Sequence, residues 1–390
     1  MSQDNAVRYV DTPAALQQFC DELGTPEWLA LDTEFLREKT YYPKLCLLQL
    51  ATPQLVACID PIAISDLTPV LDIIFDERVT KVMHSGRQDL EILYHLGGKV
   101  PVPVFDTQIA ALLLGYPEQV GYASLVSGEL GVVLDKLHTR ADWSLRPLSA
   151  DQIKYAADDV IYLVQVYQQL TEKLERFERS DWLSGDFSRL TNPDLYDIPP
   201  ADAWLKVKGG NRLRGDSLAV MQSLAVWREQ VARDKNRPKG WILRDDALLE
   251  IARHRPDSTS SLGKIRGLSE GLVKHSGNRI IDIVRQAREK KPLAFPDKGK
   301  HARLSADQGA LVDVMMAIVR LSGERNSLNP TVLATRKQLE RLVCGDREVA
   351  VLQGWRKQLV GEQLLTFITG GLSLSVQGDK LEFTNKGTSD

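Results

Sequence analysis

The chain has 390 residues, more than one average domain, so two or three domains are expected. Its 43% hydrophobic and 26% charged residues are typical of a globular protein, and it offers neither an apolar run of transmembrane length nor a secretory signal at MSQDNAVRYVDTP. The net charge of −3 conceals an asymmetry, because residues 1–200 hold 16 basic and 30 acidic residues (−14) whereas residues 201–300 hold 22 and 12 (+10). A basic middle segment indicates either a nucleic-acid surface or a solvated helical one.

Strands and helices alternate along the first half of the chain. Short apolar segments bounded by turn residues predict strands at 28–35, 44–51, 55–60, 79–84 and 101–106. Helical patterns follow at 86–97, at 107–115 and at 149–175, where Ser149 is a candidate N-cap. This order predicts a mixed α/β sheet.

The second half shows helical periodicity with no convincing strand. Two segments rich in Pro and charge, TNPDLYDIPPADAW (191–204) and KKPLAFPDKGK (290–300), predict linkers. After each linker a helix with a charged end is followed by Pro, at 236–238 (NRP) and 328–330 (LNP), and then by a second helix. The pattern predicts two copies of one small helical module, of which the second has lost much of the basic charge.

Two carboxylates stand where the first predicted strand, WLALDTEF, ends. Residues i and i+2 of a strand project from one face, so Asp32 and Glu34 point together. Such neighbours repel, and one would be driven toward protonation unless a cation lies between them. Oxygen ligands favour Mg²⁺ or Mn²⁺ over zinc. The alternative is a strand that ends in a solvated acidic turn.

Further acids accompany this pair. Tyr155 and Asp159 are four residues apart in a predicted helix, so they share a face. Asp89 lies in the first turns of the helix that begins within HSGRQDLEIL, where the helix dipole alone would favour an acid. His84 is expected to be a packed histidine at a strand end, and Asp106 is either an acid that supports the site or a helix N-terminal acid.

The motifs DTEF, HSGRQDLEIL and YAADD resemble, in order, the three exonuclease motifs of the DEDD superfamily. Because Tyr155 precedes Asp159 with three residues between them, the chain resembles the tyrosine subclass. The segments DTEFLREKTYYPKLCLLQLA and DWSLRPLS are similar to the bacterial ribonuclease D family, and the helical modules resemble HRDC domains. The resemblance implies an α/β RNase H-like exonuclease domain at 1–200, followed by two all-α HRDC-type domains, a basic one at 211–291 and a degenerate one at 301–385.

The resemblance also implies a mechanism. The family uses two divalent metal ions, Mg²⁺ or Mn²⁺, which together clamp the attacking and leaving oxygens of a phosphodiester. Asp32 would bridge both ions, Glu34 and Asp159 would complete the site that activates water, Asp89 would hold the second ion, and Tyr155 would orient the water. The expected activity is that of a 3′→5′ exoribonuclease that releases 5′-mononucleotides, with transfer RNA precursors as substrates in 3′-end maturation.

Substrate-binding residues are expected around this site and in the basic module. The candidates are Phe35, Lys136, Trp143, Arg146, Lys239, Lys264 and Arg266. Phe35 and Trp143 have core packing as their alternative. For Trp241, beside Lys239, a core position is favoured over stacking on a base.

Two other functions remain open at this point. A DNA exonuclease of the same superfamily differs in contacts to the 2′-hydroxyl, which no motif reveals, although the chain has no P-loop of a helicase. A non-catalytic RNA-binding protein is disfavoured because all five motif residues are present. Four scattered cysteines without a CxxC pair favour a reducing cytoplasm, and a monomer is expected.

Overall fold

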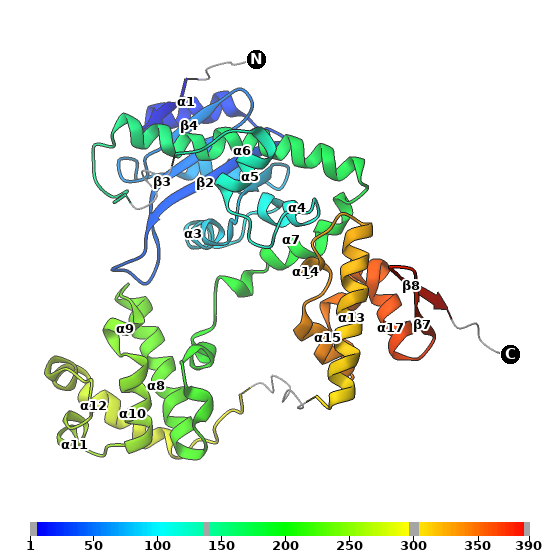
Figure 1. Ribbon diagram of the computed structural model, residues 1–390. Coiled ribbons are helices and arrows are strands. Elements are labelled where there is room, and N and C mark those ends of the chain that lie inside the picture. The colour runs from blue at the N-terminus through cyan, green and yellow to red at the C-terminus, as the bar shows by residue number, and fades with distance from the viewer. Residues whose placement is uncertain (1–5, 136–140, 296–303, 386–390) are drawn as a thin grey trace.

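The computed structural model of the chain describes residues 6–135, 141–295 and 304–385. Figure 1 shows three parts, which are a sheet domain at the top (residues 6–190), a first helical module at the lower left (residues 215–287) and a second helical module at the lower right (residues 306–385). None of the described helices is long and apolar enough to cross a membrane.

A mixed sheet forms the centre of the sheet domain. Its spatial order is β1 (Arg8–Val10), β4 (Val56–Ile59), β3 (Lys44–Ala51), β2 (Trp28–Leu36), β5 (Thr80–Met83) and β6 (Val104–Asp106). β2 is central, because it pairs antiparallel with β3 and parallel with β5. The register places Asp32 opposite Gln49 and Glu34 opposite Leu47. Beyond Glu34 the register shifts by one residue, which leaves Cys46 as the extra residue of a β-bulge.

Helices cover both faces of the sheet. They are α1 (Pro13–Leu23), α2 (Thr68–Ile74), α3 (Arg87–Gly97), α4 (Thr107–Leu112), α5 (Tyr122–Leu130), α6 (Ala150–Arg176) and α7 (Ser184–Leu190). α6 packs over one face, where Ala156, Ala157 and Val160 meet Ala30 and Cys58. Helices α1 to α3 cover the other face. Because both faces are buried, the strands are almost continuously apolar, as in KLCLLQLA.

The predicted strands and helices of this domain are confirmed within one or two residues at most ends, although β6 is shorter than the segment 101–106. Ser149 caps α6 in a capping box with Gln152, as its position before the periodic segment indicates. The sequence-based prediction missed β1, α1, α2, α5 and α7. β1 has three residues and pairs in parallel with β4, a long-range contact with no local signal.

Short 3₁₀ helices connect the sheet domain to the first helical module. These are η1 (Ser180–Leu183), η2 (Pro193–Leu195), η3 (Pro200–Lys206) and η4 (Gly210–Arg212). The module contains α8 (Gly215–Asp234), α9 (Lys239–Ile242), α10 (Asp245–His254), α11 (Thr259–Gly263) and α12 (Glu270–Ala287). It has a core of its own, which includes Leu224, Leu248 and Ile280.

The second helical module repeats this order of elements and then departs from it. Its elements are α13 (Ala306–Arg325), α14 (Pro330–Leu333), α15 (Arg336–Val343), η5 (Ala350–Leu352), α16 (Gly354–Arg356), η6 (Lys357–Gly361), α17 (Glu362–Ile368), β7 (Leu372–Gln377) and β8 (Lys380–Asn385). The prediction that residues 301–385 are all-α is wrong at the end of this range, where β7 and β8 pair as an antiparallel hairpin. Alternating residues in LSLSVQ followed by Gly378-Asp379 are the local signal for that hairpin.

The two helical modules attach to the sheet domain in different ways. The second module shares one apolar core with α4, α5 and the end of α6, and Trp182 stacks on Trp355 with ring centroids 4.9 Å apart. The first module meets the β2–β3 loop through polar contacts. Asn236 accepts hydrogen bonds from the backbone N–H groups of Tyr41 and Tyr42 at 3.1 and 3.0 Å.

Candidate active site

Three elements of the sheet domain bring four carboxylates together. β2 presents Asp32 and Glu34 on one face, α3 supplies Asp89 from its first turn, and α6 supplies Asp159. The pKa of Asp32 is raised well above its usual value, mainly by burial and then by the charges of Asp89, Asp159 and Glu34. This mutual influence shows that the sequence-predicted acids form one electrostatic cluster.

The other members of the cluster are perturbed in the same direction. Burial and the neighbouring Asp159 and Asp89 raise the pKa of Glu34 to about 8. Burial and Asp158 raise the pKa of Asp159 to about 7. Burial raises the pKa of Asp89 to about 6, although a hydrogen bond from Thr33 opposes this change. Metal-free, the cluster therefore retains protons near neutral pH that ordinary carboxyls have lost.

Asp89 is fixed by the opposite face of β2. Thr33 points away from Asp32 and Glu34, is almost completely buried, and donates its hydroxyl to the Asp89 carboxylate. The turn before α3 is held by Asp106, whose carboxylate accepts hydrogen bonds from the backbone N–H groups of Ser85 and Gly86 at 3.1 and 2.9 Å. Asp106 also caps α4, so it supports the site from beneath. The alternatives that the sequence left open for Asp106 are therefore both realised.

Asp159 and Tyr155 lie one turn apart on α6. The Tyr122 hydroxyl donates to the backbone carbonyl of Asp159 at 2.6 Å, which anchors this turn. Asp159 and Tyr155 line a pocket of about 240 Å³ with Lys154 and Asp158. Tyr155 packs beside Trp143, with ring centroids 6.2 Å apart.

Arg146, predicted to bind substrate, is instead a structural tie. Its five N–H donors are all engaged by protein acceptors: Asp60 takes two at 2.6 and 2.7 Å, and three go to the backbone carbonyls of Trp143, Leu145 and Cys46. The Cys46 carbonyl belongs to the bulge residue of β3. The prediction that Arg146 binds substrate is therefore wrong, because no N–H donor of its guanidinium group is left.

The remaining predicted substrate residues fall into different environments. Trp143 is 2% exposed, so its indole is a core group that supports Tyr155. Phe35 is partly buried against the core beneath β2. Lys239 pairs with Glu229 at 3.1 Å, and Lys136 lies outside the described residues.

Lys264 and Arg266 are exposed after α11, which Figure 1 places at the end of the first helical module remote from the sheet. Trp241 was expected in the core, but it is 63% exposed on α9.

Gln49 is a site residue that sequence reasoning missed. It faces Asp32 across the β2–β3 pair, is completely buried, and neither atom of its amide has a hydrogen-bond partner among the described residues. A buried amide without partners is costly unless a further group uses it. A polar residue in an otherwise apolar strand, KLCLLQLA, is the signal that could have found it.

The donor set suits divalent cations. Four carboxylates and one orphaned amide oxygen are hard ligands of the kind that Mg²⁺ and Mn²⁺ prefer, and cations would relieve the repulsion that raises the pKa values. Within the described part of the chain, no group of three or more His, Cys, Asp or Glu side chains is arranged so that it could hold a metal ion as it stands. Asp32, Glu34, Asp89 and Asp159 are the residues that would hold the ions.

Comparison with known proteins identifies the family. Residues 7–175 match the 3'-5' exonuclease family model, and residues 217–284 match that of the HRDC domain. A ribonuclease D of Sphingobium indicum is 40% identical over 377 residues, covering 95% of this chain and 96% of the relative. The chain belongs to the ribonuclease D family. A second relative with that name, from Nitrobacter hamburgensis, is 39% identical over 371 residues. The match covers 94% of this chain and 97% of that relative.

A solved member of the ribonuclease D family has the same architecture. The crystal structure of Escherichia coli RNase D, described as an exoribonuclease involved in structured RNA processing, has a TM-score of 0.78 at 30% identity and covers 93% of this chain and 99% of that chain. As a family member, this chain is a 3′–5′ exoribonuclease that hydrolyses phosphodiester bonds. Membership also implies dependence on divalent metal ions. The predicted family, the enzyme class and the fold class of an exonuclease sheet domain followed by an HRDC domain are thereby confirmed.

Proposed function

We propose that the four-carboxylate cluster hydrolyses RNA from the 3′ end with two divalent ions and releases 5′-mononucleotides one at a time. The observation that carries this proposal is the convergence of Asp32, Glu34, Asp89 and Asp159, in which burial and the charges of the other acids raise the pKa values of Asp32 and Glu34. Bound ions supply an acidified water and stabilise charge on the attacking and leaving oxygens. The chain's own contribution is to hold the acids in place.

Each site residue has a stated role in this proposal. Asp32 lies centrally and would contact both ions, while Glu34 and Asp159 would flank the nucleophilic water. Asp89, fixed by Thr33, would hold the ion on the leaving-group side. Tyr155 would orient the water, because a phenol with an ordinary pKa of about 10 is a poor base at neutral pH.

The natural substrates that we propose are precursors of transfer RNA with an accessible 3′ tail. A basic first helical module next to an acidic nuclease domain supports this proposal, because a polyanion that approaches the carboxylates needs cations elsewhere. We also propose that residues 301–385 are a degenerate second HRDC-like module. The order of its first three helices, long, short and medium, repeats that of α8 to α10, and α16, η6 and α17 follow one another without a gap over 354–368, where the first module has α12.

We further propose a cytoplasmic monomer. Four free cysteines, of which Cys20, Cys46 and Cys58 are buried, fit a reducing compartment. A gel-filtration measurement of the molar mass tests the oligomeric state.

The activity is tested on 5′-labelled RNA with a single-stranded 3′ tail, in Mg²⁺, in Mn²⁺ and in chelator, beside DNA of the same sequence. Metal-dependent shortening of RNA by one nucleotide at a time is the expected result. Equal shortening of DNA would make the protein a general 3′ exonuclease, and binding without shortening would favour an RNA-binding protein without catalysis. Asp159→Asn is the matched inactive control.

A further inference from the structure

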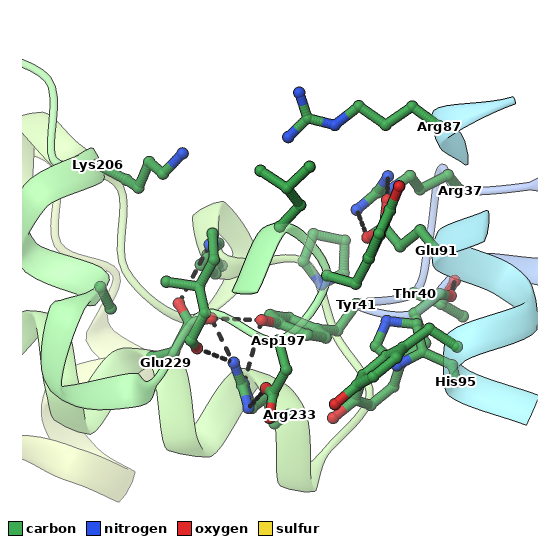
Figure 2. Close-up of a pocket in the computed structure, with 18 of the residues that line it drawn as sticks. Arg37, Thr40, Tyr41, Arg87, Glu91, His95, Asp197, Lys206, Glu229 and Arg233 are labelled. Atoms are coloured by element: carbon green, nitrogen blue, oxygen red, sulfur yellow. Dashed lines mark hydrogen bonds and ion pairs between the residues drawn. The ribbon is translucent and has the colours of Figure 1, made fainter. Parts of the chain in front are cut away.

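A second, larger pocket lies between the sheet domain and the first helical module. Its volume is about 730 Å³, which is ample for a nucleic-acid segment. The lining comes from the β2–β3 loop (37–42), α3, the 3₁₀ linker (195–206) and the end of α8 with the start of α9 (229–239). Figure 2 shows side chains from both parts of the molecule converging on it.

The carboxylates of this pocket are already satisfied. Glu91 forms a two-pronged ion pair with Arg37 at 2.6 and 2.7 Å, and Asp197 pairs with Arg233 at 3.1 Å. Glu229 accepts from Tyr41 and pairs with Arg233 at 3.6 Å and with Lys239 at 3.1 Å, so three carboxylates face three cations. The charges of these residues therefore cancel. Figure 2 shows Glu229, Arg233 and Asp197 linked with Tyr41 in one group, and the Arg37–Glu91 pair apart from it.

Two cations are left over. Arg87, on α3, and Lys206, at the end of η3, line the same pocket, and both are exposed. Neither forms an ion pair with any residue that the structure describes. In Figure 2 their charged groups reach toward each other across the mouth of the pocket, one from the sheet domain and one from the linker. Like charges that face each other across a cavity favour an anion between them.

The pocket and the carboxylate cluster are built partly on the same elements. α3 carries both Asp89 and Arg87, and residues two apart in a helix are rotated by about 200°, so one helix serves the cluster and the pocket with different faces. Arg37 follows Glu34 by three residues, which an extended chain spans in about 10 Å. An RNA strand whose 3′ end lies at the carboxylates can therefore reach the pocket with its upstream nucleotides.

We propose that this pocket binds the phosphodiester backbone of the RNA upstream of its 3′ end, with Arg87 and Lys206 clasping one phosphate between them. The inference rests on the proposed function, since it assumes an RNA 3′ end at the carboxylates. Tyr42 and His95, whose rings pack edge to face at 4.6 Å on the pocket wall, give an aromatic surface for a neighbouring base. Binding in the pocket would then depend on the length of single-stranded RNA that precedes the 3′ end.

The test is the double charge reversal Arg87→Glu/Lys206→Glu. For a labelled single strand of about twenty nucleotides, we expect the Kd in chelator to rise about tenfold or more, because two charge-assisted contacts are lost. The slope of log K against log salt should become shallower by about 1.4. With metal, the ratio of kcat/KM for the long strand to that for a dinucleotide should fall through a higher KM for the long strand.

Arg320→Glu/Lys337→Glu is the matched control, because it makes the same change of charge on exposed residues of the second helical module. It should leave the ratio of long to short substrate unchanged. The exchange Arg87→Lys/Lys206→Arg should retain most of the binding. An unchanged Kd and ratio in the reversal variant, or equal loss in the control, would overturn the proposal. Pocket-dependent binding without hydrolysis by the wild type would instead overturn the proposed function and leave the pocket standing.

Discussion

Replacing Asp159 by Asn should make the metal-free protein more stable while it abolishes catalysis. In the absence of metal, Asp159 is held among other acids, and burial raises its pKa to about 7. The folded state therefore binds a proton that the unfolded chain has released, so the stability of the wild type falls as pH rises from about 4 to 8. Asn keeps the shape of the side chain and has no proton to lose.

The magnitude follows from the two pKa values. An unfolded Asp titrates near 3.9, so the difference is about 3 units, or about 4 kcal/mol at pH 8 if the site titrates alone. At pH 5 the same relation gives about 1.5 kcal/mol. The advantage of the Asn variant should therefore grow by about 2–3 kcal/mol between pH 5 and pH 8.

Urea unfolding at pH 5 and pH 8 in chelator measures this difference. Glu172→Gln is the control, since it removes an exposed carboxylate from the same helix and should change stability little at either pH. Saturating Mg²⁺ should reduce or reverse the advantage of the Asn variant, because the wild type gains from pairing its carboxylates with cations. An Asp159→Asn variant that is no more stable at pH 8 than at pH 5, relative to the wild type, would refute the reasoning.

Three further outcomes are expected. Gln49→Leu should raise the stability of the metal-free protein by about 1–3 kcal/mol in urea titrations, because it removes an unsatisfied buried amide, and should lower kcat; unchanged kcat would assign Gln49 no part in the site. Arg146→Met should destabilise the protein by about 3–5 kcal/mol at pH 7, because Asp60, which is 1% exposed, would lose its ion-pair partner. At urea concentrations at which the variant is still folded, its affinity for RNA should equal that of the wild type. Trp355→Ala should lower the free energy of unfolding of the second helical module by about 3–5 kcal/mol through the lost stacking on Trp182, seen as loss of hydrogen-exchange protection in α13.

The residues that local chemistry determines were predictable from sequence. Alternation in a strand fixes Asp32 and Glu34 on one face, and the four-residue spacing fixes Tyr155 beneath Asp159. The start of α6 followed from Ser149 and the apolar period after it. The placement of Asp89 beside them required the motif order that the family shares, because nothing local brings α3 to β2.

The errors concern residues whose role depends on distant partners. Arginine is a common phosphate ligand, yet the guanidinium group of Arg146 is hydrogen-bonded to Asp60, which lies 86 positions away in sequence. Trp241 was expected in a core because most tryptophans are largely buried, but α9 packs Ile242 against the core of the module and leaves Trp241 exposed. The pocket that Arg87 and Lys206 line is formed only when the first helical module packs against the sheet domain, so no single segment of the sequence predicts it.

The shared core of the second helical module has a consequence for the order of events during synthesis. Leu113, Val126 and Leu170 of the sheet domain are buried together with Val332 and Leu364, which a ribosome adds roughly 200 residues later. When every catalytic carboxylate of the nascent chain has been synthesised, part of the apolar surface of its sheet domain therefore remains exposed until the helices of the second helical module have been added. The final segment of the chain thus acts as the closure of the first domain, and a prematurely terminated product would carry the nuclease motifs on a domain with an open core.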